Sequence, residues 1–235
     1  MAVNRSRAEW KTYGNVFDKF TINILHKLSG QGYFEELESA IAMGKEANVF
    51  TARKKDGSLV IVKIYRLENC HFNKMCEYIK QDSRYVSLRK NKRDIIFNWV
   101  QREYRNLMIA REVIQVPTPI AFKNNVVVMS LIGKEIPALQ LKNKAPADPK
   151  AFLSTIINNI KLLWKKGIVH GDLSAFNILI DNEKPIFIDF SQSTTTKSGN
   201  AEDLLRRDLN NIRIFFEKLN MTLDVDKTMK DIVSE

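Results

Sequence analysis

Two short apolar segments joined by a turn, directly after a polar loop, constrain this chain more than any other feature. The loop is VHGDLSAFN, residues 169–177, and it follows an apolar stretch with helical spacing. Ile178–Asp181 and Ile186–Asp189 are typical of two short strands around the turn residues Asn182–Glu183. The spacing therefore predicts a β-hairpin whose first strand begins where the polar loop ends.

Three polar side chains of this region form a set that suits phosphoryl transfer. Asp172, in the loop, can accept a proton from an incoming hydroxyl or orient it. Asn177 offers an amide oxygen and Asp189 a carboxylate oxygen, which are ligands that Mg²⁺ prefers. Each residue alone is equally typical of a turn or a loop cap. The combination H-G-D-L-S-x-x-N followed by I-D-F-S favours the catalytic interpretation.

A lysine in the front half of the chain is the best candidate for holding phosphates. Lys63 lies within the apolar segment VIVKIY, residues 60–65, and a buried amine requires an anion. The phosphates of a nucleotide would meet that need, with a carboxylate from a helix holding the amine in place. Glu103, on the helix expected over residues 94–112, is the best candidate for this carboxylate. The alternative is that Lys63 extends to solvent and that Glu103 is exposed.

A glycine-containing turn precedes this lysine. Gly44, Lys45 and Glu46 lie between two strand-like segments, and backbone amides in such a turn can face phosphate oxygens. Only one glycine is present where a phosphate loop would have three, so an ordinary hairpin turn is the alternative. The signal depends on the context that Lys63 and Asp189 provide.

The remaining pattern predicts an α+β chain with a strand-rich front half and a mostly helical back half. The seam lies near Leu131–Gly133, and residues 133–149 have the composition of a linker. Asp148–Pro149 is typical of a helix start, and Gly167 of its end. The other expected helices cover residues 16–29, 201–219 and 224–233, and the other expected strands cover residues 38–41, 47–53, 59–65, 120–123 and 126–131.

Charge and cysteine content narrow the class of protein. The net charge of +10 favours a polyanionic partner such as RNA, although a solvated basic surface is the alternative. Two cysteines, Cys70 and Cys76, argue against a disulfide-stapled secreted protein. No apolar stretch approaches the length of a membrane span. We therefore expect a soluble, cytoplasmic protein without a membrane partner.

From about residue 36 onward the chain resembles protein kinases, and specifically the atypical RIO kinase family. The C-terminal segment NAEDLLRRDLNNI and the sequence of the phosphate loop resemble those of the first RIO subfamily, of archaeal type. The segments that carry the resemblance are GKEANVF as the phosphate loop, VKIYR as the lysine strand, WVQREYRNL as the helix with the pairing glutamate, HGDLSAFN as the catalytic loop and IDFSQS as the metal-binding turn.

This resemblance implies a two-lobed kinase-like fold without a long activation segment, and it implies site residues. Asp172 would be the catalytic aspartate, Glu103 the partner of Lys63, and Asn177 and Asp189 the ligands of Mg²⁺, for which Mn²⁺ could substitute. Asp189 would also be the site of an aspartyl-phosphate. The residues expected to contact ATP are Gly44, Lys45, Glu46, Lys63, the gatekeeper Met129, and the backbone of Ser130 and Ile132.

The resemblance also implies an organisation and a setting. Residues 1–35 would form a helical extension, residues 36–132 an N-lobe with a flexible loop at about 66–92, and residues 133–235 a C-lobe. The protein would be a monomeric serine/threonine kinase or ATPase that acts on the maturing small ribosomal subunit. Two features depart from the family pattern. Ser198–Gly199 replaces the usual His-Pro, and the autophosphorylated serine of the flexible loop has only Ser83 and Ser87 as nearby candidates.

Two rival functions remain at this point. Aminoglycoside and choline kinases also use H-G-D and a later I-D-F, but they usually place His where this chain has Ser174. They also carry a larger helical lobe than the residues after Asp189 could form. The other rival is a ribosome-assembly scaffold in which the nucleotide only sets the conformation.

Overall fold

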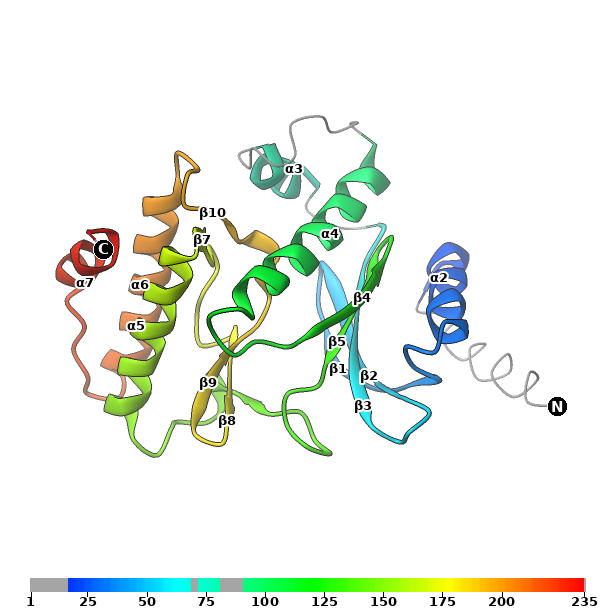
Figure 1. Cartoon of the computed structure of the whole chain (residues 1–235), viewed down its shortest axis with the longest axis horizontal. Helices are drawn as coiled ribbons and strands as arrows, with labels where there is room; N and C mark the ends of the chain where they lie inside the picture. Colours follow the sequence, from blue (N-terminus) through cyan, green and yellow to red (C-terminus); the bar gives the residue numbers. More distant parts are fainter. Residues whose placement is uncertain (1–16, 69–71, 81–90, 235) are drawn as a thin grey trace. The chain divides into compact units, whose positions relative to one another are not determined.

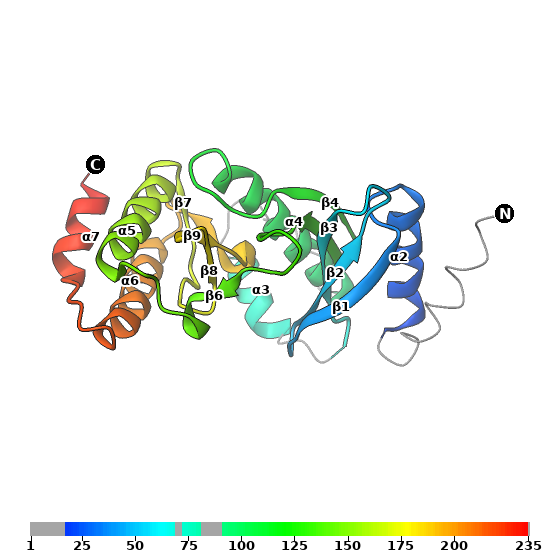
Figure 2. The same cartoon turned by 90° about the horizontal axis from the view of Figure 1, so that it is seen from below.

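The computed structural model describes residues 17–68, 72–80 and 91–234 (Figures 1 and 2). The chain divides into two compact units. Unit 1 comprises Met1–Met75, Arg89–Gln101 and Pro119–Leu131, and unit 2 comprises Cys76–Leu88, Arg102–Thr118 and Ile132–Glu235. The predicted division into an extension and two lobes stays a prediction. Ser83, Ser87 and Cys70 lie outside the described residues, as do residues 69–71 and 81–90 of the predicted flexible loop.

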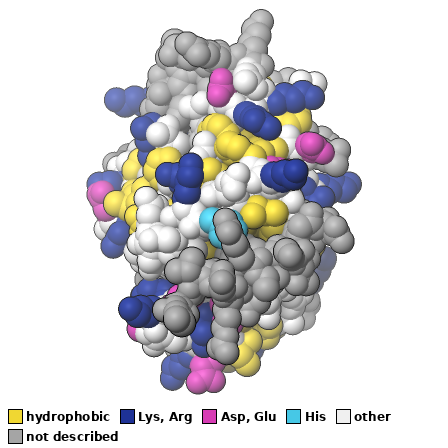
Figure 3. All heavy atoms as spheres, turned by 90° about the vertical axis from the view of Figure 1, so that its right-hand side faces the viewer, with side chains coloured by type: hydrophobic (Ala, Val, Ile, Leu, Met, Phe, Trp, Pro, Cys, Tyr) yellow, Lys and Arg dark blue, Asp and Glu magenta, His cyan; other side chains and the backbone are white. Residues whose placement is uncertain are grey.

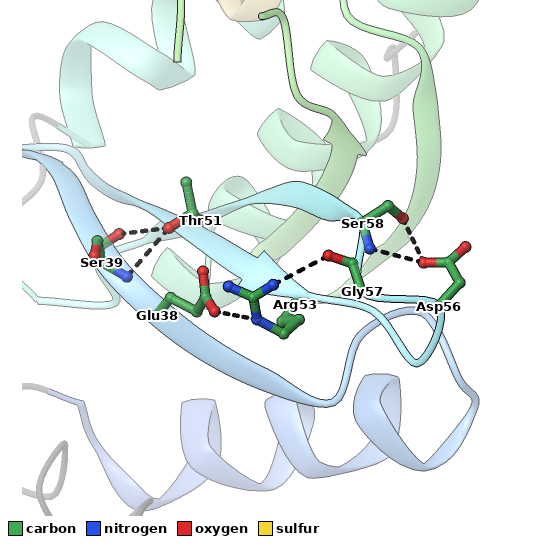
Figure 4. A network of polar contacts seen from close by, with 7 residues as sticks. All are labelled: Glu38, Ser39, Thr51, Arg53, Asp56, Gly57 and Ser58. Carbon is green, nitrogen blue, oxygen red and sulfur yellow. Dashed lines mark hydrogen bonds and ion pairs between the residues drawn. The ribbon is translucent and has the colours of Figure 1, made fainter. Parts of the chain in front are cut away.

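Unit 1 is built on an antiparallel sheet of five strands with the order β1-β2-β3-β5-β4. The strands are β1 (Glu36–Met43), β2 (Ala47–Arg53), β3 (Leu59–Tyr65), β4 (Pro119–Lys123) and β5 (Val126–Ser130). The β2–β3 turn contains Gly57 at φ 82°, a conformation that glycine adopts without a steric penalty. In the same turn, Asp56 accepts hydrogen bonds from the backbone and side chain of Ser58 (Figure 4).

The pairing of β1 with β2 is irregular near its middle. The register shifts between Leu37 and Ala40. At this shift the Ser39 amide donates to the Thr51 hydroxyl at 3.1 Å, and Glu38 pairs with Arg53 (Figure 4). The Thr51 hydroxyl therefore provides an acceptor for a backbone amide at the point where the ladder between the strands is interrupted.

Helix α2 (Lys19–Gly30) packs on one face of this sheet. Its N-cap is Asp18, whose carboxylate accepts the Thr21 amide at 2.9 Å. Its buried residues share one stripe and join side chains of the central strands in one apolar core, which includes Ile24, Leu25, Leu28, Val60, Val62, Val126 and Val128. The predicted helix over residues 16–29 is thus present.

Helix α3 (Phe72–Lys80) lies within residues 66–92, where the family resemblance implied a flexible loop. The next helix, α4 (Lys92–Ala110), contains the boundary between the two units. Within unit 1, Phe97 of α4 stacks on Phe20 of α2 with the ring centroids 5.8 Å apart.

Unit 2 consists mainly of helices with two small sheets, one formed by β10 and β7 and one with the order β6-β8-β9. Its helices after α4 are α5 (Pro149–Lys165), α6 (Ala201–Glu217) and α7 (Val225–Val233), with the 3-10 turns η3 (Leu141–Asn143) and η4 (Phe190–Gln192). Its strands are β6 (Leu139–Gln140), β7 (Ile168–Val169), β8 (Ile178–Asp181), β9 (Lys184–Phe187) and β10 (Thr194–Thr195). Asp148 caps α5 as predicted, accepting the Ala151 amide at 3.0 Å.

Two expectations are corrected. The predicted linker over residues 133–149 contains β6 and η3, because β6 pairs with β8. The predicted strand Ile186–Asp189 ends at Phe187, since Asp189 has φ 63° and ψ 69° and cannot continue an extended strand. Within the described residues, no helix has the length and apolar character needed to cross a membrane. The predicted α+β class is confirmed.

Candidate active site

Side chains of helix α6 hold the loop that carries Asp172 in place. Asp208, only 1% exposed, accepts the Gly171 amide at 2.7 Å and the Leu173 amide at 2.8 Å. Asn211, one helical turn further on, donates to the Leu173 carbonyl at 3.0 Å. One buried carboxylate and one amide therefore fix the backbone on both sides of Asp172.

Gly171 is required at this position of the loop. Its φ is 78°, and an added Cβ would lie 3.1 Å from the Gln192 carbonyl oxygen. A larger residue would therefore strain the backbone and press against the segment after Asp189. Arg207 donates to the Gly171 carbonyl and to the Tyr78 hydroxyl, and thereby links Tyr78 to the same loop within unit 2.

The burial of Asp208 changes its acidity. Burial raises the pKa of the Asp208 carboxyl from 3.8 to about 7, although the two loop amides and the Arg207 guanidinium act in the opposite direction. The charge of Asp172 adds to the upward shift. The carboxylate that supports the loop is therefore near its titration point at neutral pH.

His170 joins the loop to the strand that leads to Asp189. Its Nε2 lies 3.0 Å from the Ile188 carbonyl oxygen. A carbonyl oxygen only accepts, so Nε2 carries the hydrogen, and Nδ1 accepts the Asp172 amide at 3.3 Å. The ring is 2% exposed and packs on Phe190 with centroids 4.7 Å apart, so it acts as a fixed brace.

Asn177 lies beside Asp172 with a defined orientation. Its Nδ2 donates to the Asp172 carbonyl at 2.8 Å and approaches the Asp172 carboxylate at 3.3 Å. Because the carbonyl requires a donor, the amide oxygen of Asn177 must point to the other side. The sequence-predicted pair is thus brought together, and the orientation suits a cation ligand.

Asp189 follows the β9 strand at the same end of the hairpin. Ile178 pairs with Phe187, and the Ile188 amide donates to the Asn177 carbonyl at 3.0 Å, so the backbones next to Asn177 and Asp189 are in contact. The Asp189 carboxylate accepts the Ser191 hydroxyl at 2.7 Å. The predicted metal-binding residues therefore lie on adjacent arms of one hairpin.

The turn after Asp189 is fixed by two buried side chains of α4. Asn106 donates to the carbonyls of Phe190 at 3.0 Å and Ser193 at 2.9 Å. Arg102 donates from Nε to the Ser193 carbonyl at 3.0 Å. These bonds satisfy carbonyls of a turn that has no sheet partner and so hold the left-handed position of Asp189.

The donor set around the hairpin fits Mg²⁺ and the phosphates of ATP. Amide and carboxylate oxygens come from Asn177 and Asp189, and Mg²⁺ usually takes few protein ligands and completes its shell with water and phosphate oxygens. Among residues 17–68, 72–80 and 91–234, no group of three His, Cys, Asp or Glu side chains suits a metal ion.

The other predicted site residues lie partly in unit 1. Lys63, on β3, is 7% exposed, and its ammonium lies 5.0 Å from the centre of the Tyr65 ring. Met129 and Ser130 lie on β5, paired with the strand of Lys63. Gly44 forms a tight turn, with its amide donating to the Ala47 carbonyl at 3.0 Å and no room for a Cβ, and Lys45 and Glu46 follow in it.

Two of the predicted residues belong to unit 2 instead. Glu103, on α4, is 1% exposed, which contradicts the alternative of a solvent-exposed carboxylate. Ile132 accepts the Ala138 amide at 2.9 Å within a turn. The pairing of Lys63 with Glu103, and the contacts of both with a nucleotide, stay predictions.

Sequence reasoning missed the residues that support the loop and the turn. The signal for Asp208 was a carboxylate in the apolar stripe of α6, between Leu205 and Ile212. The signal for Arg102 and Asn106 was the presence of two more polar residues near Glu103, one position before it and three positions after it, on a buried face of the helix. Ser191 carried no signal beyond its place in the IDFSQS segment.

Comparison with known proteins gives a consistent picture. A family model described as the RIO domain matches residues 48–228. The chain is 40% identical over 225 residues to a protein named RIO-type serine/threonine-protein kinase Rio1 from Methanocaldococcus jannaschii, covering 94% of this chain and 76% of that protein. It is 31% identical over 238 residues to the human serine/threonine-protein kinase RIO1, covering 98% of this chain and 42% of the human protein.

The fold is similar to that of solved kinases. The Rio2 kinase from Chaetomium thermophilum, in a complex with ADP, Mg²⁺ and phosphoaspartate, superposes with a TM-score of 0.70 at 27% identity, over 89% of this chain and 65% of that chain. Another structure of the same kinase gives a TM-score of 0.69 over 88% of this chain and 66% of that chain. The predicted kinase-like architecture is confirmed, including the short segment between Asp189 and α6.

Proposed function

This chain belongs to the RIO family, in its Rio1 subfamily, and is an atypical serine/threonine kinase; we propose that Asp172, Asn177 and Asp189 perform its ATP-dependent phosphoryl transfer. The observation that carries this proposal is the contact between Asn177 and Asp172, which directs the amide oxygen away from the loop. A cation held there would also meet the carboxylate on the next hairpin arm.

Each residue has a defined part in the reaction. Asp172 accepts the proton of the attacking hydroxyl, or orients it, as the oxygen–phosphorus bond forms and the bond to ADP breaks. Asn177 and Asp189 would hold Mg²⁺, which would supply positive charge to the phosphates. Asp208, Asn211 and His170 keep the backbone around Asp172 in place before substrate binds, so that little reorganisation is needed. Mn²⁺, another oxygen-seeking ion, is proposed as a substitute.

The nucleotide contacts from the front half are proposed on the basis of burial and strand position. Lys63 would bind the phosphates with Glu103 as its partner, because both charged groups are buried and each requires an opposite charge. The turn Gly44–Lys45–Glu46 would cover the phosphates. Met129 would limit the adenine pocket, and the backbone of Ser130 and Ile132 would bind the base.

Asp189 is also proposed to accept the phosphoryl group itself. A carboxylate oxygen would attack the γ-phosphorus, ADP would leave, and water would later hydrolyse the acyl-phosphate. The solved Rio2 kinase complex contains phosphoaspartate, and this modification of a related kinase supports the proposal for Asp189. The Ser191 hydroxyl donates to the Asp189 carboxylate at 2.7 Å, which would orient that carboxylate.

A mass measurement after incubation with Mg²⁺ and ATP tests these proposals. A phosphoryl group that borohydride removes, with Asp189 reduced to an alcohol, would support the aspartyl-phosphate. A stable phosphate on serine or threonine would support protein phosphorylation alone. ATP binding without ADP, phosphate or phosphoprotein would contradict phosphoryl transfer and favour a nucleotide-switched scaffold.

A role in maturation of the small ribosomal subunit is proposed from charge. The chain carries a net charge of +10, and Figure 3 shows Lys and Arg side chains spread over one face among apolar ones. A basic surface of this kind binds polyanions such as ribosomal RNA. Binding to pre-ribosomal RNA should weaken steeply as salt rises, and salt-independent association would contradict an RNA contact. Action in the cytoplasm as a monomer belongs to the same proposal.

A further inference from the structure

We propose that four side chains in and beside the phosphotransfer loop (residues 169–177) dock the protein acceptor, and that this acceptor presents an apolar side chain beside an acidic one. The four are Ile136, Leu139, Lys142 and Phe176, and we name them the acceptor patch. All of them belong to unit 2. The inference deepens the proposed function and rests on it, because it names the class of acceptor for the same phosphoryl transfer.

The apolar members are unusually exposed for their size. Ile136 is 77% exposed, Phe176 58% and Leu139 53%. A phenylalanine in water contributes nothing to the core, whereas its burial against a partner would stabilise a complex by about 1.5–3 kcal/mol. Ile136 and Leu139 are three positions apart, and the side chain of Gln140 in the same segment donates to the Phe176 carbonyl. Exposed apolar side chains on neighbouring segments mark interaction surfaces more often than single ones do.

The patch is ordered rather than loose. Gln140 donates from its side chain to the Phe176 carbonyl at 2.7 Å, and the Lys142 amide donates to the Ala175 carbonyl at 3.0 Å. Leu139 pairs with Ile180 across the β6–β8 ladder. The side chains are therefore presented from a backbone that is already fixed, which lowers the entropy lost on binding.

Ile136 is held outward by a tight turn. Gly133 has φ 113°, and a Cβ there would lie 2.2 Å from the Ile136 carbonyl oxygen. The turn is closed by the bridge between Gly133 and Pro137 and by the Ala138 amide, which donates to the Ile132 carbonyl at 2.9 Å. The exposure of Ile136 thus follows from the geometry of the turn.

Charge identifies the partner. The Lys142 ammonium lies 4.4 Å from the centre of the Phe176 ring and, among the described residues, has no carboxylate partner. Lys144, the next lysine along the chain, is already paired with Glu183 at 3.3 Å. The patch therefore offers one unneutralised cation on an aromatic ring, which an acidic side chain beside an apolar one would complement.

The chain itself limits how far the anchor lies from the acceptor hydroxyl. Phe176 is four residues after Asp172, and four residues of chain span at most about 14 Å. An extended peptide whose hydroxyl reaches Asp172 would reach Phe176 within roughly four residues at the rise of a β-strand. The apolar and acidic side chains should therefore lie within about four positions of the phosphorylated serine or threonine.

The same features favour a protein over a nucleic acid. Proteins that bind single-stranded RNA combine several cations along the RNA backbone with stacking aromatic rings. The acceptor patch has one unpaired cation and two aliphatic side chains for its single aromatic ring. A peptide segment fits this composition better.

Phosphorylation of synthetic peptides tests the proposal. One serine peptide carries Leu and Asp within four positions of the serine, a second replaces Asp by Lys, and a third replaces Leu by Ser. The enzyme variants are Leu139→Ser and Lys142→Glu, with the exposed residues Val233→Ala and Lys227→Glu of α7 as matched controls. Peptide-independent ATP hydrolysis is measured for each protein in parallel.

The proposal predicts that wild type prefers the Leu–Asp peptide. Leu139→Ser should raise the KM for that peptide about tenfold. The substitution removes an apolar contact between Leu139 and the leucine of the peptide, and burial of a leucine stabilises a complex by this order of magnitude. Lys142→Glu should reverse the preference in favour of the Lys peptide, which a general loss of folding cannot produce. The controls should match wild type, and ATP hydrolysis should be unchanged in all four variants.

Several results would overturn the proposal. These are equal use of the three peptides, no reversal with Lys142→Glu, or ATP hydrolysis without phosphorylation of any peptide. Loss of a wild-type dimer, or of RNA binding, in Leu139→Ser would assign the patch to self-association or to RNA. A wild-type protein that binds ATP but does not turn it over would instead contradict the proposed function itself.

Discussion

Replacement of Asp208 tests whether α6 supports the phosphotransfer loop. Asp208→Ala removes both acceptors of the loop amides, at 2.7 Å from Gly171 and 2.8 Å from Leu173, without touching a residue proposed to contact substrate. Asp208→Asn keeps one acceptor and places an amide donor against the other backbone N–H. Asp203→Ala, an exposed acid in the first turn of the same helix, is the matched control.

The magnitude follows from the two hydrogen bonds. A buried donor without a partner costs about 1–3 kcal/mol, so two of them lower the free energy of unfolding of Asp208→Ala by about 2–6 kcal/mol. Asp208→Asn loses one acceptor, so its free energy of unfolding should fall by about half as much. Asp203→Ala removes only a favourable interaction with the helix dipole, worth about 0.3–1 kcal/mol.

Urea unfolding at pH 8, where Asp208 is ionised in the native state, measures the three free energies. Turnover of ATP by the folded variants is measured under the same conditions. We expect the turnover rate to decrease in the order wild type, Asp203→Ala, Asp208→Asn, Asp208→Ala. If Asp208→Ala unfolds within about 0.5 kcal/mol of Asp203→Ala and retains wild-type turnover, the two amides do not depend on this carboxylate and the reasoning fails.

Three further predictions concern pH, the metal turn and the phosphate lysine. The pKa of Asp208 is about 7 in the native state and 3.8 ordinarily, so the native state binds the proton more tightly; the contribution of this group to the free energy of unfolding is full below pH 3.8 and is lost as the pH rises to about 7. Urea unfolding across that range should show the loss in wild type but not in Asp208→Asn, and parallel curves would contradict it. Ser191→Ala should lower kcat by about tenfold with little change in the KM for ATP, because one hydrogen bond that orients Asp189 is lost; an unchanged kcat would show that the hydroxyl has no positioning role. Lys63→Ala should weaken binding of ATP but not of adenosine in calorimetric titrations, whereas an equal loss for both would indicate a damaged fold.

Local sequence signals predicted much of the fold because the turns depend on residues that tolerate positive φ. Asn124 and Asn182 lie at φ 50° and 48°. Asn124 lies between the strands predicted over residues 120–123 and 126–131, and Asn182 lies in the predicted turn Asn182–Glu183. The cap at Asp148 and the apolar stripes of the long helices are equally local. The site residues Asp172 and Asn177 were predictable for the same reason, since five residues of one loop bring them into contact.

Long-range contacts set the limit of such prediction. The two residues of β6 form a strand only because β8 lies beside them, so their segment looked like a linker. Arg102 and Ser193 are 91 positions apart, and Asp208 and Gly171 are 37 apart. Nothing near these residues in the sequence shows where their buried polar groups are satisfied, so their roles emerge only from the folded chain.

The central claim is that Asp172 performs or positions the proton transfer in phosphoryl transfer from ATP. The most direct measurement is single-turnover release of labelled phosphate, or labelling of protein, by Asp172→Asn, together with its affinity for ATP. We predict that turnover falls at least about a hundredfold, as expected when a general base is removed, while the affinity for ATP stays within a factor of about two. Turnover equal to that of wild type, at equal ATP affinity, would contradict the claim.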